Sequence, residues 1–466
     1  MLHQAGNRFN AQELWQQDRD HVLHPYQHFD SFKKEGSLVL VEGDGCYVTD
    51  ATGRRYLDGI GGMWCVNAGY GRKEIAETMA EQALQLCYSN FFVDVTNAPA
   101  ARLAAKLAEL APGTLNHVAY ATSGSCAVDT AIRMAHFYQS RRGQPTRRYV
   151  ISRKNSYHGS TYLGMTVGLR DGDQSEHFKY IPDLVHHLSA PYPYRRPDGM
   201  GLEAFSDFLV AEFEAKIAEL GAENIACFIA EPAQASGGVT IPPPNYLPRM
   251  RELCTRHGIL FIADEIVTAF GRLGHFFASE AEFGVIPDMI LCAKGLTSGY
   301  IPLSCVIFSD AVHEGISATD PDVWFTHGYT YSGHPVACAV ALKNIEIIER
   351  EDLCGNAARV GDYLEKRLAE LRDFDIVGDV RGRRLMMCVE YVKDKKTRER
   401  LPDSCNISKR ISNACEADGL LVRPIGHLDV LSPPLTITKE QVDFVVDTLK
   451  RAILKATAEL KAEGVI

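Results

Sequence analysis

The stretch LFIADEIVTAFG, Leu260 to Gly271, places two adjacent carboxylates directly after a run of apolar residues. A short apolar run of this kind is typical of a strand that is buried on both faces. An ionised carboxylate at the edge of an apolar core is unfavourable unless a specific group is paired with it. A metal ion, a buried arginine or a bound cofactor could be the partner of Asp264 or Glu265.

Similar apolar runs recur through the middle of the chain. We expect buried strands at residues 117–121, 149–152, 225–230, 259–263, 289–293 and 303–308. Between them, residues 202–221 and 246–258 carry apolar side chains at helical spacing and end on glycine. This alternation predicts an α/β fold whose central sheet is mainly parallel and is flanked by helices.

The two ends of the chain differ from this middle part. Residues 38–59 alternate apolar and polar side chains around glycine-containing turns and predict a hairpin. The C-terminal part begins with a long helical pattern, which leads to strand-like stretches and a terminal helix. We therefore expect a large domain at residues 61–335 and a smaller α+β domain at 336–466, which the N-terminal segment 1–60 completes.

Composition narrows the class of protein. The chain has 466 residues, of which 46% are hydrophobic and 23% charged, as in ordinary globular proteins. Its net charge of −10 argues against a nucleic-acid or membrane partner. The N-terminus has no leader-like pattern, and no apolar run is long enough to span a membrane. The thirteen cysteines occur without a C-x-x-C pair, so we expect reduced thiols, no metal site and a cytoplasmic location.

Several common catalytic motifs do not occur. The sequence has no G-x-G-x-x-G, G-K-[ST], H-E-x-x-H or G-x-S-x-G. The sequence therefore lacks the usual signatures of a dinucleotide enzyme, a nucleoside triphosphatase, a zinc protease and an α/β-hydrolase.

Three of the predicted strands end on an ionisable residue. Glu231, Asp264 and Lys294 each follow one of these strands directly, at intervals of 33 and 30 residues. Because parallel strands end at one edge of a sheet, where open α/β sheets bind ligands, these side chains should meet. Each alone could be structural, as a loop start, a helix cap or a surface lysine. Three successive strand ends favour a functional site.

Two further motifs add a phosphate cradle and an aromatic side chain. In YATSGSCAVDTAIRMAHFY a strand runs into a serine-glycine turn and then a helix, whose free N–H groups could bind a phosphate. An ordinary capped helix would also explain this motif. NSYHGST (155–161) is either a polar loop or a segment that places Tyr157 over a planar ligand. Together with the aspartate and the lysine, these are the parts that hold pyridoxal 5'-phosphate, whose aldehyde forms an imine with lysine.

On these motifs the sequence resembles the class III aminotransferases, which are fold type I pyridoxal-phosphate enzymes, and among them the ω-amino acid and amine:pyruvate transaminases. The resemblance extends from Trp15 to LSPPLTI (431–437). It implies that Lys294 forms the imine and that Asp264 pairs with the pyridine nitrogen. It assigns the other cofactor contacts to Gly124, Ser125, Tyr157, His158, Glu231, Ile266 and Thr330.

The family is built from dimers with shared sites, or from tetramers of such dimers. The resemblance therefore implies a homodimer or homotetramer with the site at the subunit interface. Thr330, in the HGYTYSGHP segment, would reach the cofactor phosphate of the neighbouring subunit.

The resemblance also implies a substrate pocket. GMWCVNAGYGR (62–72) matches the amine:pyruvate group and places Trp64 in the pocket with Phe92 of YSNFF. Ornithine- and γ-aminobutyrate-type relatives have an arginine shortly before the paired prolines, where this chain has Val430. Arg423 instead matches the mobile arginine that binds a carboxylate, although a surface arginine on a strand is the alternative. The chain departs from the family pattern at Cys126, Ala235, Ser236, Ala269 and Leu273.

These features predict a ping-pong transaminase that moves an amino group from a primary amine or ω-amino acid to a keto acid, with pyruvate as the expected acceptor. An aminomutase, epimerase or decarboxylase on the same fold is the alternative, and a non-catalytic cofactor-binding protein is a third hypothesis. Polyamines, β-alanine, taurine and longer ω-amino acids all remain open as donors.

Overall fold

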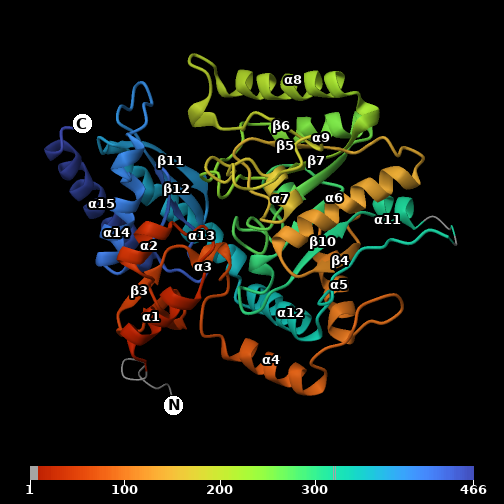
Figure 1. Ribbon diagram of the computed structural model, residues 1–466, viewed down its shortest axis with the longest axis horizontal. Coiled ribbons are helices and arrows are strands. Elements are labelled where there is room, and N and C mark those ends of the chain that lie inside the picture. Colours follow the sequence, from red (N-terminus) through yellow and green to blue (C-terminus); the bar gives the residue numbers. More distant parts are fainter. Residues whose placement is uncertain (1–8, 318–319, 321) are drawn as a thin grey trace.

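The centre of the molecule is a seven-stranded sheet (Figure 1), seen in a computed structural model that describes residues 9–317, 320 and 322–466. Residues 1–8 of the predicted N-terminal segment lie outside the described residues. The strand order is β4-β10-β9-β8-β7-β5-β6. The strands are β4 (His117–Ala121), β5 (Tyr149–Arg153), β6 (Val185–Leu188), β7 (Ile225–Ala230), β8 (Leu260–Asp264), β9 (Met289–Cys292) and β10 (Ser304–Phe308).

The sheet is mainly parallel, as the sequence predicts. Only β10 runs antiparallel to its neighbours, β4 and β9. All six predicted strands are confirmed to within one residue at each end. The sequence does not predict β6, because its four residues, VHHL, include two histidines that interrupt the apolar pattern.

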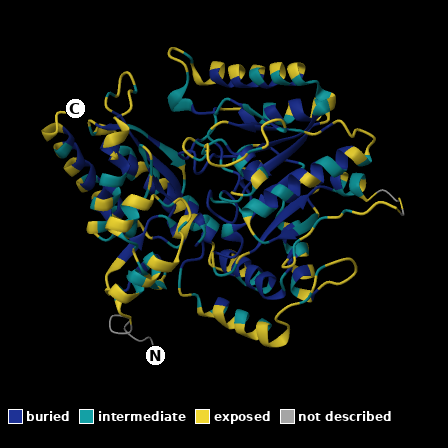
Figure 2. Cartoon of the chain, in the orientation of Figure 1, coloured by how far each residue is buried: buried dark blue, intermediate teal, exposed yellow. Residues whose placement is uncertain are grey.

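Helices cover both faces of this sheet. Successive side chains of β7 point to opposite faces of the sheet. Ile229 packs with the helix α6 (Gly124–Arg141) on one face, and Phe228 belongs to the apolar core on the other face. The other face is covered by α5 (Ala98–Leu110), α8 (Leu202–Leu220), α9 (Tyr246–His257) and α12 (Pro335–Arg350). Figure 2 shows the strands buried, whereas α8 and α4 (Lys73–Gln85) each present an exposed side to solvent.

The two ends of the chain meet in a second, four-stranded sheet. The predicted N-terminal hairpin is part of a three-stranded antiparallel unit, β1 (Leu40–Asp44), β2 (Tyr47–Asp50) and β3 (Arg55–Asp58). β3 pairs in parallel with β13 (Leu420–Leu421), so Leu57 lies opposite Leu420. The N-terminal and C-terminal segments thus share one sheet, and they lie together on the left of Figure 1.

A third sheet abuts the carboxyl edge of the central one. Its order is β11-β12-β15-β14, with β11 (Val377–Arg383), β12 (Met386–Tyr391), β14 (Arg423–Ile425) and β15 (Leu428–Leu431). It packs with α13 (Leu353–Ala369) and α14 (Ile407–Ala417), and α15 (Lys439–Ala462) packs against these two helices. Arg381 of β11 donates to the carbonyl of Gly238, which lies in the loop beyond β7, over 2.8 Å. The division at residues 60 and 335 stays a prediction.

Within the described parts of the chain, no helix has the length and apolar character that crossing a membrane requires.

Candidate active site

The carboxyl ends of β7, β8 and β9 border a cavity of about 150 Å³. Its walls bring together the three strand-end residues, the serine-glycine turn and the aromatic residue that the sequence analysis placed in one site. The lining residues are Gly124, Ser125, Tyr157, His158, Gly159, Glu231, Ala233, Ala235, Ser236, Asp264, Ile266, Val267, Ala293 and Lys294.

Asp264 is paired with an imidazole. Its Oδ2 lies 2.7 Å from Nδ1 of His158, and its Oδ1 accepts the N–H of Ile266 over 3.2 Å. Both side chains of the pair are buried, and Nε2 of His158 has no partner among the described residues. An Nδ1–H that donates to Asp264 holds the carboxylate in place and leaves it an acceptor toward the cavity.

Glu265, the second carboxylate of the opening stretch, faces away from the cavity. It accepts three hydrogen bonds, from the Thr268 hydroxyl over 2.9 Å and from the N–H groups of Ala278 and Ser279 over 2.7 and 2.9 Å. These two N–H groups begin the short helix α10 (Ala278–Ala281). Glu265 therefore fixes the loop beyond β8, and the two neighbouring carboxylates have different tasks.

Replacing Glu265 by alanine should destabilise the fold without acting on the site. The change leaves buried N–H groups without an acceptor, so we expect a loss of about 2 kcal/mol or more in the free energy of unfolding. A lower midpoint of urea unfolding would measure it, with activity per folded molecule nearly unchanged. An unchanged midpoint would show that the three bonds contribute little.

Lys294 extends from a strained turn into the cavity. It lies at the end of β9 with a φ of 45°, in the left-handed region that non-glycine residues seldom adopt. The next residue, Gly295, packs so closely that an added Cβ would come within 2.3 Å of the Asn67 side chain. Burial lowers the pKa of the Lys294 amine from its ordinary value. The turn aims the amine, and the lowered pKa favours the neutral form that can attack a carbonyl.

The start of α6 forms one wall of the cavity. Ser123 caps this helix by accepting the N–H of Cys126 over 3.2 Å, and as its first residues Gly124 and Ser125 have no intrahelical acceptor for their N–H groups. The Ser125 hydroxyl accepts the N–H of Ser160 over 3.0 Å. Gly159 (φ +105°) passes so close that an added Cβ would lie 2.4 Å from this hydroxyl. Hydroxyl, helix N-terminus and close backbone together form an anion cradle.

Glu231 holds two loops of the opposite wall in place through hydrogen bonds. One of its oxygens accepts the N–H of Tyr157 over 3.1 Å, and the other accepts the N–H of Ala235 over 2.9 Å. Burial raises the pKa of this carboxyl. Glu231 lines the cavity, and both its oxygens are used to position the neighbouring loops.

Four residues assigned to the site by resemblance do not line this cavity. Trp64 is buried in a cluster with Ala233 and Ala235 of the cavity wall. Phe92 lines a separate hollow of about 800 Å³, and the carbonyl of Thr330 beside that hollow accepts the Tyr88 hydroxyl over 3.0 Å.

The fourth of these residues, Arg423, lies directly opposite Val430 in the β14–β15 pair. Cross-strand partners project from the same face of a sheet. Arg423 thus extends from the same face of the sheet as Val430, but from the neighbouring strand. Its Nη1 contacts the sulfur of Met63.

The five residues that depart from the family pattern fall into two groups, those that line the cavity and those that do not. Ala235 and Ser236 line the cavity, whereas Cys126, Ala269 and Leu273 are not among its lining residues. Sequence reasoning missed Gly159, Ala233, Val267 and Ala293, and only Gly159, a glycine inside a polar motif, carried a signal that could have indicated it.

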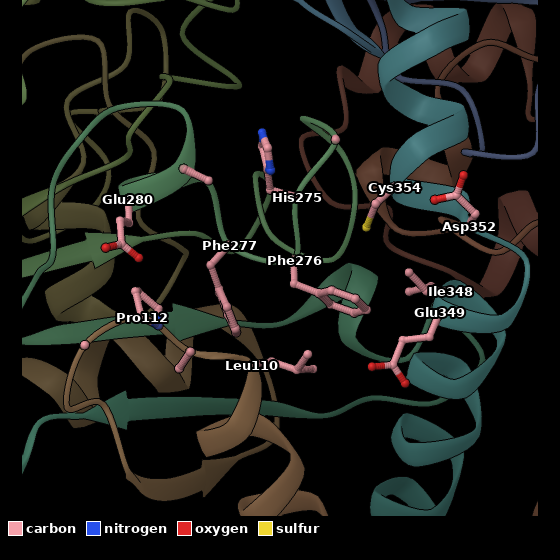
Figure 3. A pocket seen from close by; sticks show the side chains of 14 residues that line it. Leu110, Pro112, His275, Phe276, Phe277, Glu280, Ile348, Glu349, Asp352 and Cys354 are labelled. Carbon is pink, nitrogen blue, oxygen red and sulfur yellow. The ribbon is translucent and has the colours of Figure 1, made fainter.

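A larger hollow, of about 620 Å³, has different chemistry (Figure 3). Carboxylates of Glu280, Glu349 and Asp352 border it together with His275 and Cys354. Neither a lysine nor an arginine is among its described lining residues. It therefore has no amine to form an imine and no cation to bind a phosphate, so its greater size does not make it the better candidate.

The smaller cavity fits pyridoxal 5'-phosphate. A lysine of lowered pKa can form the imine, a buried carboxylate can hold a protonated ring nitrogen, and a helix N-terminus with a serine can bind the phosphate. Tyr157 and Ile266 supply the walls for a planar ring.

Comparisons with known proteins agree with this chemistry. The family described as Aminotransferase class-III matches residues 31–453. The putrescine–pyruvate aminotransferase of Pseudomonas aeruginosa is 40% identical over 446 residues, which cover 95% of this chain and 96% of that protein.

Two solved structures share the fold. An (S)-enantioselective omega-transaminase from Thermomicrobium roseum has a TM-score of 0.93 at 41% identity, over 96% of this chain and 99% of that one. An amine transaminase from an uncultivated Pseudomonas species, in its PLP-bound form, has a TM-score of 0.89 at 39% identity, over 94% and 99%. The fold is that of the fold type I transaminases, and the cofactor is pyridoxal 5'-phosphate. The chain is an aminotransferase acting on amines or amino acids, and it belongs to the class III family.

Proposed function

We propose that the protein transfers an amino group from a primary amine or ω-amino acid to pyruvate by a ping-pong mechanism. The donor leaves as an aldehyde or ketone, and pyruvate leaves as alanine, so that one amino group and one carbonyl oxygen exchange places. The observation that carries the proposal is the buried Lys294 amine in one cavity with Asp264. The relative named for putrescine and pyruvate supports this acceptor.

In this reaction pyridoxal phosphate, when bound, accepts the electrons of the donor carbon and stores the amino group. The chain's residues do the rest. The neutral Lys294 amine moves the proton from the donor carbon. Asp264, oriented by His158, holds a proton on the ring nitrogen. Arg423 binds the carboxylate of the keto acid through its planar guanidinium.

The test supplies purified holoenzyme with an amine and pyruvate and measures alanine. Stoichiometric formation of alanine and of the donor's carbonyl product is expected. A cofactor-dependent change in the amine without alanine would instead support a mutase, epimerase or decarboxylase.

We further propose that the protein works as a homodimer, or a tetramer of dimers, in the cytoplasm. All thirteen cysteines are free, which suits a reducing compartment. Exposed apolar residues gather on two neighbouring segments, among them Leu86, Val93, Trp324 and Tyr331. Phe92 and Thr330 lie on these same segments and away from their own chain's cavity, as a contribution to the partner's site requires.

Mixing two inactive variants tests this arrangement. If Thr330 acts across the interface, a heterodimer of Lys294→Ala and Thr330→Ala contains one site with both residues intact, so activity should reappear at roughly a quarter of the wild-type level after subunit exchange. The control mixes each variant with itself. Lack of recovery, despite mixed dimers seen by native mass spectrometry, would contradict a contribution from the partner.

A further inference from the structure

An ion pair beside the cavity has no task in the mechanism above. Arg170 and Asp173 follow the helix α7 (Tyr162–Val167), and Nη2 of Arg170 donates to Oδ1 of Asp173. The two side chains are only 10% and 8% exposed. In the described part of the chain this is the single hydrogen bond that the Arg170 side chain makes, so most of its five N–H donors are free to bind another group.

Aromatic rings hold the Arg170 guanidinium next to the cavity. Its central carbon lies 5.2 Å from the ring centre of Tyr157, which lines the cavity, and 5.5 Å from that of Tyr26. Contacts of this kind stabilise a cation against an aromatic face and limit its motion. The guanidinium is therefore held against Tyr157, a residue of the cavity that Lys294 also lines.

Arg423 carries a second guanidinium, whose charge interacts with that of Arg170. Burial lowers the pKa of Arg423, and the positive charge of Arg170 lowers it further, while Tyr157, Tyr26 and Asp173 oppose this effect. Among the residues that the structure describes, Arg423 has no ion-pair partner. Two partly buried guanidinium groups thus share one carboxylate, and an anionic ligand would balance the remaining charge.

We propose that Arg170 is a specificity-determining residue, which binds, together with Arg423, the acid group at the far end of the amine donor. The donor class is then an ω-amino acid that ends in a carboxylate or a sulfonate. A diamine is disfavoured, because its second ammonium would meet two guanidinium groups. This inference rests on the proposed transaminase function and narrows it to one class of donor.

Donors of equal length that differ at the far end provide the test. β-Alanine, propylamine and 1,3-diaminopropane form one set, and 5-aminopentanoate, pentylamine and 1,5-diaminopentane form a second. Each is added to holoenzyme without a keto acid, and the loss of the cofactor's visible absorbance gives the second-order rate constant of the donor half-reaction. The wild-type protein should react fastest with the acid and slowest with the diamine in at least one set. 3-Aminopropanesulfonate, compared with butylamine, distinguishes a sulfonate donor from a carboxylate donor.

Arg170→Met should lower the acid-to-neutral ratio of these rate constants by at least about tenfold, the effect of losing one charge-assisted hydrogen bond. Arg170→Lys keeps the charge and should retain part of the ratio. The affinity for pentanoate, which has no amine to react, should fall in parallel in Arg170→Met. Arg249→Met is the matched control, since Arg249 forms an ion pair with Asp207 over 2.7 Å on exposed helices.

The results separate this inference from the proposed function. An equal loss for acid, neutral and diamine donors would overturn the inference, because it would give Arg170 a purely structural role. A wild-type preference for the diamine would overturn it as well, while leaving the transaminase intact. A failure of every amine to react would overturn the proposed function, and the inference with it.

Discussion

Replacing Lys294 by alanine should lower kcat for every donor by at least about 10³-fold. The variant loses both the amine that forms the imine and the base that moves the proton, and no other lysine lines the cavity among the described residues. Single-turnover absorbance with an amine, followed by steady-state formation of alanine, measures the loss.

A second readout separates chemistry from folding. Borohydride reduction of the wild-type holoenzyme should attach the cofactor to the peptide that contains Lys294, as mass spectrometry can show, and the variant should have no such label. Lys154→Ala is the matched control, because Lys154 follows the parallel strand β5 but is exposed to solvent. Turnover within about tenfold of wild type in Lys294→Ala would refute the assignment.

Asp264→Asn should cost about 10²-fold or more in kcat while the cofactor stays attached to the lysine. The amide has nearly the shape of the carboxylate and can still accept the N–H of His158, but it has no charge to hold a proton on the ring nitrogen. Borohydride labelling at Lys294 should remain, so that a loss of rate is not a loss of the cofactor.

Glu265→Gln is the comparison for this variant. It makes the same chemical change one residue further along the chain. The hydrogen bonds of this carboxylate to described residues come from Thr268 and the start of α10. Its activity per folded molecule should stay close to wild type. Equal losses in the two variants would show that the charge of Asp264 has no special part in the reaction.

The sequence was sufficient for six of the seven strands of the central sheet. Strands buried on both faces must be apolar throughout, and the helices between them repeat at a different period, so both patterns are local. β6 is not predicted, because two histidines interrupt the apolar pattern of a strand of four residues. The meeting of Glu231, Asp264 and Lys294 also followed from the sequence, because parallel strands bring their carboxyl ends to one edge.

Other features depended on contacts between segments that are distant in the sequence. Nothing near Asp264 indicates that His158, 106 residues earlier, is its partner, or that Glu265 binds the start of α10. The register of the strands decides that β3 pairs with β13 and that Arg423 lies opposite Val430. Register depends on packing across the whole sheet.

The sequence by itself determined the fold class and the meeting of Lys294 and Asp264 at one edge of the sheet, because burial and strand order impose local patterns on the chain. Only the tertiary structure decided which groups surround them, including the placement of Arg170 against Tyr157. The physical reason is that charges and hydrogen bonds act over a few ångströms in space, whatever the distance along the chain.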